Sequence, residues 1–153
     1  MNKRLFSIGL ALVLGAGYAL IAVSQVRPDV LVKQRQAVMT LQNKYVSGQL
    51  RPMAQGKIPY DANVAARNAG YLDALSQMPW DGFAPSTKDV KSRALPAVFS
   101  DTAKFKEAQD RFRGEVGKLV AATKGGDEAA VKAQILAVSK ACDTCHDNFR
   151  EKQ

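Results

Sequence analysis

Residues 127–150 have the sequence DEAAVKAQILAVSKACDTCHDNFR. Apolar side chains recur in this stretch at alternating steps of four and three residues: Val131, Ile135, Val138, Cys142, Cys145 and Phe149. This spacing places them on one face of an α-helix, and Asp127 is a residue type that commonly caps a first helical turn. The stretch therefore predicts a long amphipathic helix that turns its apolar face to a protein core.

Three further segments show the same helical period. They cover residues 28–47, 61–78 and 100–125, and Pro or Gly residues mark their ends. Residues 48–60 and 79–99 are richer in Pro and Gly and are predicted as loops. No stretch alternates with period two, and the short turn at Gly125-Gly126 favours antiparallel neighbours. The sequence thus predicts an all-α protein, an antiparallel up-down-up-down four-helix bundle.

Composition limits the class of protein. The chain has 153 residues, of which 46% are hydrophobic and 24% charged, so it is neither disordered nor fibrous and suits one domain. Its formal charge is +8. Because the Lys residues are scattered without interleaved aromatic residues, we expect no nucleic-acid partner. The charge is expected instead to steer anionic redox partner proteins.

The N-terminus has the features of an export signal. Residues 1–4 (MNKR) form a basic head, residues 5–23 are mostly apolar, and Ala22-Val23-Ser24 supplies small residues at a cleavage site. We predict a secretory signal peptide over residues 1–24 and a mature domain over residues 25–153. The alternative is a retained anchor, since the apolar run approaches the roughly 20 residues that span a bilayer. Both interpretations place the domain in the periplasm, with membrane contact only if the segment is retained.

Cys142, Cys145 and His146 form a CxxCH motif, the pattern of c-type haem attachment. On a helix these residues occupy positions i, i+3 and i+4, so both thiols and the imidazole project from one side within a single turn. The thiols can add to the two vinyl groups of a haem as thioethers, which leaves the imidazole beneath the iron. We expect one covalently attached haem c per chain, enclosed by the bundle.

Other uses of the two cysteines fit the sequence less well. Two residues in mid-helix do not readily reach the geometry of a disulfide. A thioredoxin-like pair follows a strand, and none is predicted there. Two Cys and one His are also too few for a Cys₄ or Cys₂His₂ zinc site within one chain. Haem attachment is therefore the interpretation that the sequence favours.

The sixth position of the iron is constrained because His146 is the only histidine. Met, Lys, water or no ligand remain. Met39 lies within the first predicted helix, whereas Met53 is in a predicted loop and Met78 abuts Pro79. We expect Met39 to line the distal haem face without a permanent bond to iron. The alternative is that Met39 is the sixth ligand.

These residues resemble those of the class II c-type cytochromes, and in particular the cytochrome c′ family. The likeness covers essentially the whole mature chain, through Arg35-Gln36 and residues 57–61, 78–80, 99–101 and 142–150. A haem motif near the C-terminus is itself distinctive of this class.

The resemblance implies a role for each site residue. Cys142 and Cys145 hold the haem, and His146 is the proximal ligand. Arg35 and Gln36 approach the haem and its propionates. Arg150 sits beside the proximal face, and Met39 falls where the family places its distal pocket residue. The sequence departs from the family at Arg93, where members often carry an acidic residue, so the resemblance implies no haem-edge contact there.

Two functions follow as expectations. A five-coordinate iron under an apolar distal face would admit small diatomic gases such as NO and CO, and would also transfer electrons. In the alternative, Met39 bound to iron gives a low-spin class II cytochrome that acts purely as an electron carrier. An enzyme is not expected, because the chain offers no distal His. The resemblance also implies a homodimer built on the first two helices.

Overall fold

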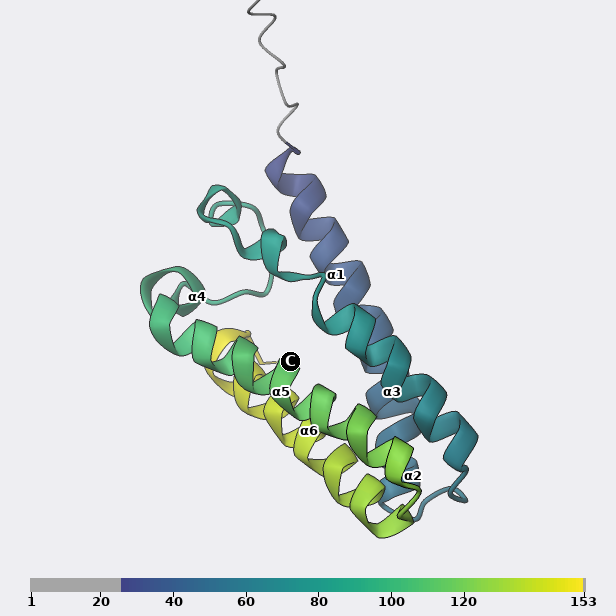
Figure 1. Cartoon of the computed structure of the whole chain (residues 1–153). Coiled ribbons are helices and arrows are strands. Elements are labelled where there is room, and N and C mark those ends of the chain that lie inside the picture. Colours follow the sequence, from purple (N-terminus) through teal and green to yellow (C-terminus); the bar gives the residue numbers. More distant parts are fainter. Residues whose placement is uncertain (1–25, 153) are drawn as a thin grey trace, which may run out of the picture.

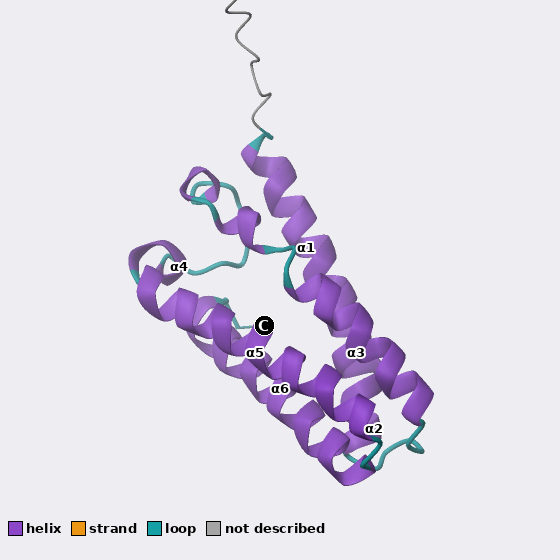
Figure 2. Ribbon diagram, viewed as in Figure 1, coloured by secondary structure: helices purple, strands orange, loops and turns teal. Residues whose placement is uncertain are grey.

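The computed structural model describes residues 26–152, and four long helices dominate it. These are α1 (Pro28–Tyr45), α3 (Ala62–Ser76), α5 (Thr102–Gly125) and α6 (Glu128–Phe149). Successive helices run in opposite directions, with α1 beside α3 and α5 beside α6 (Figure 1). Within residues 26–152 there is no β-strand, only one isolated bridge between Ala94 and Arg150 (Figure 2). The predicted all-α up-down-up-down bundle is confirmed, whereas the predicted signal peptide lies outside the described residues.

Local capping chemistry fixes where three of the long helices begin. The Asp61 side chain accepts a hydrogen bond from the backbone N–H of Val64, and Asp101 and Asp127 cap α5 and α6 in the same way. Such caps pair backbone donors that have no partner inside the helix. Gly126 follows α5 with a φ of 76°, a left-handed conformation that favours glycine. The predicted starts of these three helices were therefore correct.

The predicted end of the first helix at Ser47-Gly48 was wrong. The chain continues from α1 through a π-helix, η1 (Val46–Leu50), into α2 (Arg51–Ala54). The physical reason is burial, because the Val46, Leu50 and Met53 side chains are at most 4% exposed in the core. Packing of these side chains outweighs the helix-ending tendency of a Ser-Gly pair. Met53 accordingly lies in the core and not in a loop.

The segment between α3 and α5 is irregular, as predicted, with three short helical turns. These are η2 (Trp80–Phe83), η3 (Pro85–Thr87) and α4 (Ala97–Ser100), and η2 packs against α1. The segment also pairs with the residues that follow α6. Leu95 N–H donates to the Phe149 oxygen at 3.0 Å, and Glu151 N–H donates to the Arg93 oxygen at 2.9 Å.

The hydrophobic core fills one end of the bundle. Its buried side chains come from η1 and α2 and from parts of α3, α5 and α6: Val46, Leu50, Met53, Ala65, Ala69, Leu72, Phe112, Val116, Leu119, Val131, Ile135, Val138 and Ala141. The end where α6 finishes, beneath η2 and the 93–95 segment, is not filled in this way. It holds the cavities described next.

Candidate haem site

Two adjoining cavities lie between α1, α5, α6 and the η2 turn. The smaller has a volume of about 140 Å³ and the larger about 560 Å³. Each cavity has lining residues of its own, and six residues line both: Met39, Asn43, Trp80, Cys145, His146 and Arg150. Because they share these walls, we treat them as two compartments of one hollow. The larger compartment falls within the roughly 300–1,000 Å³ of a cofactor pocket.

The α6 wall carries the two thiols and the imidazole. Cys142 lines the smaller cavity, while Cys145 and His146 line both. Both cysteines are free. Burial raises the pKa of Cys142 to about 12 and that of Cys145 to about 11. The thiols are therefore protonated at neutral pH, unlike the reactive thiolate of a redox pair.

His146 is poised as a neutral ligand. Desolvation in the cavity wall, followed by the positive charge of Arg150, lowers its pKa below the usual value. A neutral imidazole has the free lone pair that a metal requires. The arrangement therefore supplies one nitrogen donor at the hollow.

An ion pair fixes the turn that bears the cysteines. An Arg51 nitrogen lies 3.0 Å from an Asp143 carboxylate oxygen, and the same nitrogen donates to the Ser139 backbone oxygen at 3.4 Å. Arg51 belongs to α2 and Asp143 stands between the two cysteines, so the pair ties the motif to the helix that follows α1. Arg51 and Asp143 also line the smaller cavity.

The α1 wall faces α6 across the hollow. Gln36, Met39 and Asn43 line it at helical spacing, together with Arg35 one turn before Met39. Arg35 is only 5% exposed. Its Nη1 donates to the Gly82 backbone oxygen, and its Cζ lies 4.3 Å from the centre of the Phe83 ring. Arg35 thus joins α1 to the η2 turn.

Aromatic rings close the remaining side. The ring centres of Phe83 and Phe105 are 4.8 Å apart, those of Phe105 and Phe149 are 5.2 Å apart, and those of Trp80 and Phe83 are 6.1 Å apart. Trp80 is held in place by its Nε1, which donates to the Ser76 oxygen at 2.7 Å. Two of these pairs are edge-to-face, and together the rings give the hollow an apolar lining that suits the apolar body of a cofactor.

The structure brings every sequence-predicted site residue to this hollow. Arg35, Gln36, Met39 and Arg150 join the CxxCH residues in its walls: Cys142, Cys145 and His146. The walls also contain residues that were not predicted as site residues. Asn43 is one of them, and it could have been found from its spacing, one turn beyond Met39 on the same face. Arg93 is a correction: the resemblance implied no haem-edge contact there, yet Arg93 lines the larger cavity, because its place depends on the distant Phe149–Glu151 segment.

Comparison with known protein families matches residues 30–150 to the family described as Cytochrome C′. The chain belongs to the cytochrome c′ family. Cytochrome c′ of Rubrivivax gelatinosus is 44% identical over 127 residues, which are 82% of this chain and 98% of the relative. Cytochrome c′ of Alcaligenes xylosoxydans xylosoxydans is 36% identical over 127 residues, 83% of this chain and 98% of the relative. The resemblance noted from the sequence is thus confirmed.

Solved cytochrome c′ structures share the fold. The crystal structure of the Rubrivivax gelatinosus protein has a TM-score of 0.78 at 42% identity and covers 82% of this chain and 98% of its own. A nitric oxide complex of a mutant cytochrome c′ from Alcaligenes xylosoxidans has a TM-score of 0.77 at 36% identity, with 84% and 98% covered. A carbon monoxide-bound variant of that protein has a TM-score of 0.76 at 36% identity, with 83% and 98% covered.

The cofactor of this family is haem c, and the hollow fits it. The two free thiols and the imidazole on one turn of α6 match the chemistry of thioether attachment and axial ligation. Apolar rings line the walls, and Arg35, Arg93 and Arg150 line the larger cavity, where their guanidinium groups can pair with carboxylates.

Proposed function

We propose that this cytochrome c′ family member is a periplasmic haem c protein that binds small diatomic gases such as NO and CO and transfers single electrons. One observation carries the proposal: the thiols and imidazole of α6 face Met39 of α1 across a single hollow. The nitric oxide and carbon monoxide complexes of the Alcaligenes protein support the gas ligands. When bound, the haem supplies an iron that takes up a diatomic ligand and changes oxidation state by one electron.

In this proposal Cys142 and Cys145 hold the haem through two thioethers, and His146 binds the iron. The covalent bonds prevent loss of the cofactor by dilution outside the cytoplasm. The Arg51–Asp143 ion pair holds the turn between the cysteines against α2, which keeps the two sulfur atoms and the imidazole in register. Arg150 lines the same wall one turn beyond His146 and favours the neutral imidazole.

Met39 controls what reaches the opposite side of the hollow. Its thioether is uncharged and flexible, and it lines both compartments opposite His146. It therefore excludes water and charged ligands and leaves room only for small uncharged ones. We propose a five-coordinate iron, with Met39 beside the iron and not bound to it. If Met39 did bind, the protein would act as an electron carrier alone.

The larger compartment positions the polar edge of the haem. Arg35 and Gln36 line this compartment from α1, and we propose that they bind the haem and its propionates. Arg35 is the better fixed of the two, through its contacts with Gly82 and Phe83. We propose no enzymatic reaction, since the chain has a single His and the smaller cavity's carboxylate, Asp143, is already paired.

We further propose that the protein is exported and that it forms a homodimer. Residues 1–24 act as the signal peptide and residues 25–153 form the periplasmic domain. None of the helices within residues 26–152 is both long and apolar enough to cross a membrane. We also propose a homodimer through α1 and α3, supported by exposed apolar side chains on and beside them: Leu41, Tyr71 and Met78 are 42%, 47% and 56% exposed.

The test is to express the full chain in a host with working cytochrome maturation, and to measure the mass and the ferric spin state of the purified protein. We expect a mass equal to the mature polypeptide plus one haem, and a high-spin ferric iron. A colourless protein with the mass of bare polypeptide would overturn the haem site. A haem-loaded, low-spin protein would keep the haem site and replace gas binding by the electron carrier with Met39 as ligand.

A further inference from the structure

The larger cavity is lined by positive charge without a balancing carboxylate. Arg35, Arg93 and Arg150 all line it, and none of its lining residues is Asp or Glu. The three side chains come from α1, from the segment before α4, and from the residue that follows α6. Three distant parts of the chain therefore bring guanidinium groups to one compartment.

No carboxylate within residues 26–152 forms an ion pair with these guanidinium groups. Every ion pair in that part of the chain involves other cations. Burial of the Arg35 guanidinium costs free energy, because the group stays charged while desolvation lowers its pKa. An anionic ligand at this compartment would offset that cost.

The chain holds Arg93 at the cavity by long-range pairing. Its backbone oxygen accepts from Glu151 N–H at 2.9 Å, and its Nη2 donates to the Glu151 backbone oxygen. The neighbouring bridge between Ala94 and Arg150 aligns the two segments. A guanidinium has five N–H donors, so Arg93 keeps donors for a further acceptor after these contacts.

We propose that Arg93 binds a carboxylate of the haem at the rim of the larger cavity and thereby raises the reduction potential of the iron. The inference rests on the proposed haem site and goes beyond the roles of Arg35 and Gln36. Reduction adds one negative charge to the cofactor, so a nearby fixed cation favours the reduced state. The effect is local because Arg93 is half-buried and therefore less screened than an exposed charge.

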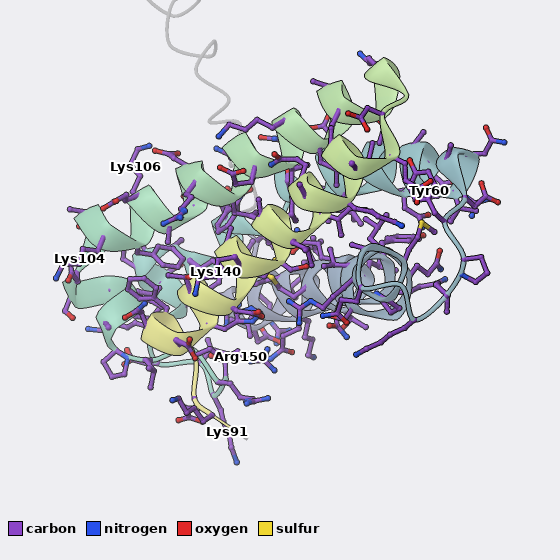
Figure 3. All side chains as sticks on the ribbon, turned by 90° about the horizontal axis from the view of Figure 1, so that it is seen from below. Tyr60, Lys91, Lys104, Lys106, Lys140 and Arg150 are labelled. Atoms are coloured by element: carbon purple, nitrogen blue, oxygen red, sulfur yellow. The ribbon has the colours of Figure 1, made fainter. Side chains whose placement is uncertain are left out.

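The experiment compares Arg93→Gln and Arg93→Lys with a matched control, Lys91→Gln. The control removes the same charge two residues away, from an exposed side chain that does not line the cavity. Figure 3 shows Lys91 near the same end of the molecule as Arg150, with its side chain directed outward. Each haem-loaded protein is titrated between its ferric and ferrous forms, and resonance Raman spectra record the bending bands of the haem carboxylates.

We expect Arg93→Gln to shift the ferrous-to-ferric ratio at fixed potential at least about threefold toward ferric, a fall of about 30 mV for one electron. Its carboxylate bending bands should move while its absorption spectrum keeps the parental ligation. Arg93→Lys should retain most of the potential but still move the bands, because an ammonium lacks the planar fork. This variant keeps the test available should the Gln variant fail to take up haem.

Three results would overturn the proposal while leaving the haem site intact. The first is an unchanged potential and unchanged bands in Arg93→Gln. The second is an equal fall in Lys91→Gln, which would show a diffuse charge effect. The third is a parental potential that changes with inorganic phosphate at constant ionic strength, which would show that Arg93 binds an anion from solution. Absence of haem from the parental protein would instead overturn the proposed function itself.

Discussion

Arg35 and Gly82 are in direct contact where α1 meets the η2 turn. Nη1 of Arg35 donates to the backbone oxygen of Gly82. A Cβ atom on Gly82 would lie 2.5 Å from the Arg35 Cβ and 2.8 Å from the Leu31 backbone oxygen. The turn that carries Trp80 and Phe83 can therefore approach α1 this closely only because residue 82 has no side chain.

We predict that Gly82→Ala destabilises the fold by about 1–3 kcal/mol, the usual cost of overpacking a buried site. The added methyl group would push η2 away from α1, and with it the aromatic wall of the hollow. Denaturant unfolding of the haem-loaded protein, followed by far-ultraviolet circular dichroism, measures the change.

Gly114→Ala is the matched control for this substitution. Gly114 lies inside α5, and a Cβ atom there would meet nothing within 4 Å. Alanine should stabilise the helix by roughly 0.5–1 kcal/mol, because it loses less conformational freedom on folding. The two Gly-to-Ala changes should thus have opposite signs. Equal effects would contradict a packing role for Gly82.

Signals that act within a few residues were predictable from the sequence. Asp61, Asp101 and Asp127 cap helices through hydrogen bonds to backbone N–H groups two or three residues ahead. The CxxCH motif needs only one helical turn to bring its thiols and imidazole together. Helical spacing likewise places Arg35, Gln36 and Met39 close together on the first helix, whereas the site roles of Arg35 and Gln36 came from the resemblance to the family.

Features that depend on distant contacts were not predictable. Ser47-Gly48 signals a helix end, yet the chain continues as a π-helix because Val46 and Leu50 are buried against other helices. Arg93 reaches the hollow only through pairing with Glu151, 58 residues away. No local sequence pattern predicts the burial of Val46 and Leu50 or the pairing of Arg93 with Glu151, since both depend on contacts between segments that are distant in the sequence.

The exposed apolar side chains beside α1 and α3 give a prediction for assembly. Tyr71 is 47% exposed, and its ring centre lies 5.2 Å from that of Tyr45 on α1. Tyr71→Glu would place a charge in the proposed dimer interface. We expect dimer affinity to fall by about tenfold or more, which corresponds to roughly 1.4 kcal/mol. Sedimentation equilibrium measures this change.

Leu136→Glu is the control for the assembly prediction. Leu136 is 43% exposed but lies on α6, away from the proposed interface. It should leave the dimer affinity unchanged, and circular dichroism should show that both variants keep their helices. A parental protein that is monomeric at all concentrations, or a control that dissociates equally, would contradict a dimer through α1 and α3.

A pH dependence is expected from Glu115 on α5. Hydrogen bonds from Lys118 and Gln134, the first being the larger cause, lower the pKa of its carboxyl below the usual value. A lowered folded-state pKa means that ionised Glu115 stabilises the fold at neutral pH. This contribution is lost as the pH falls through the folded-state pKa.

We therefore predict that Glu115→Gln lowers stability at pH 7 by at most about 1 kcal/mol, since Lys118 is largely exposed. The difference from the parental protein should vanish in acid, below the folded-state pKa. Urea unfolding at several pH values tests this, with Glu107→Gln, at an exposed position of the same helix, as the control. A difference that persists unchanged in acid would show that packing, and not ionisation, is responsible.

Substitutions at Met39 distinguish a five-coordinate iron from an iron with Met39 as its sixth ligand. If Met39 is a steric barrier, replacing it by Ala should leave the ferric spectrum unchanged. The replacement should also speed CO binding by about tenfold, the effect of removing roughly 1.4 kcal/mol of activation barrier. Met39→Leu is the matched control, because it keeps the apolar bulk and removes the sulfur atom. It should leave both the spectrum and the CO rate near parental values. If Met39 is instead a ligand, both variants must convert a low-spin spectrum to a high-spin one and lower the potential, since each loses the thioether. Stopped-flow CO binding together with ferric absorption spectra distinguishes these outcomes, because bulk and sulfur are removed separately.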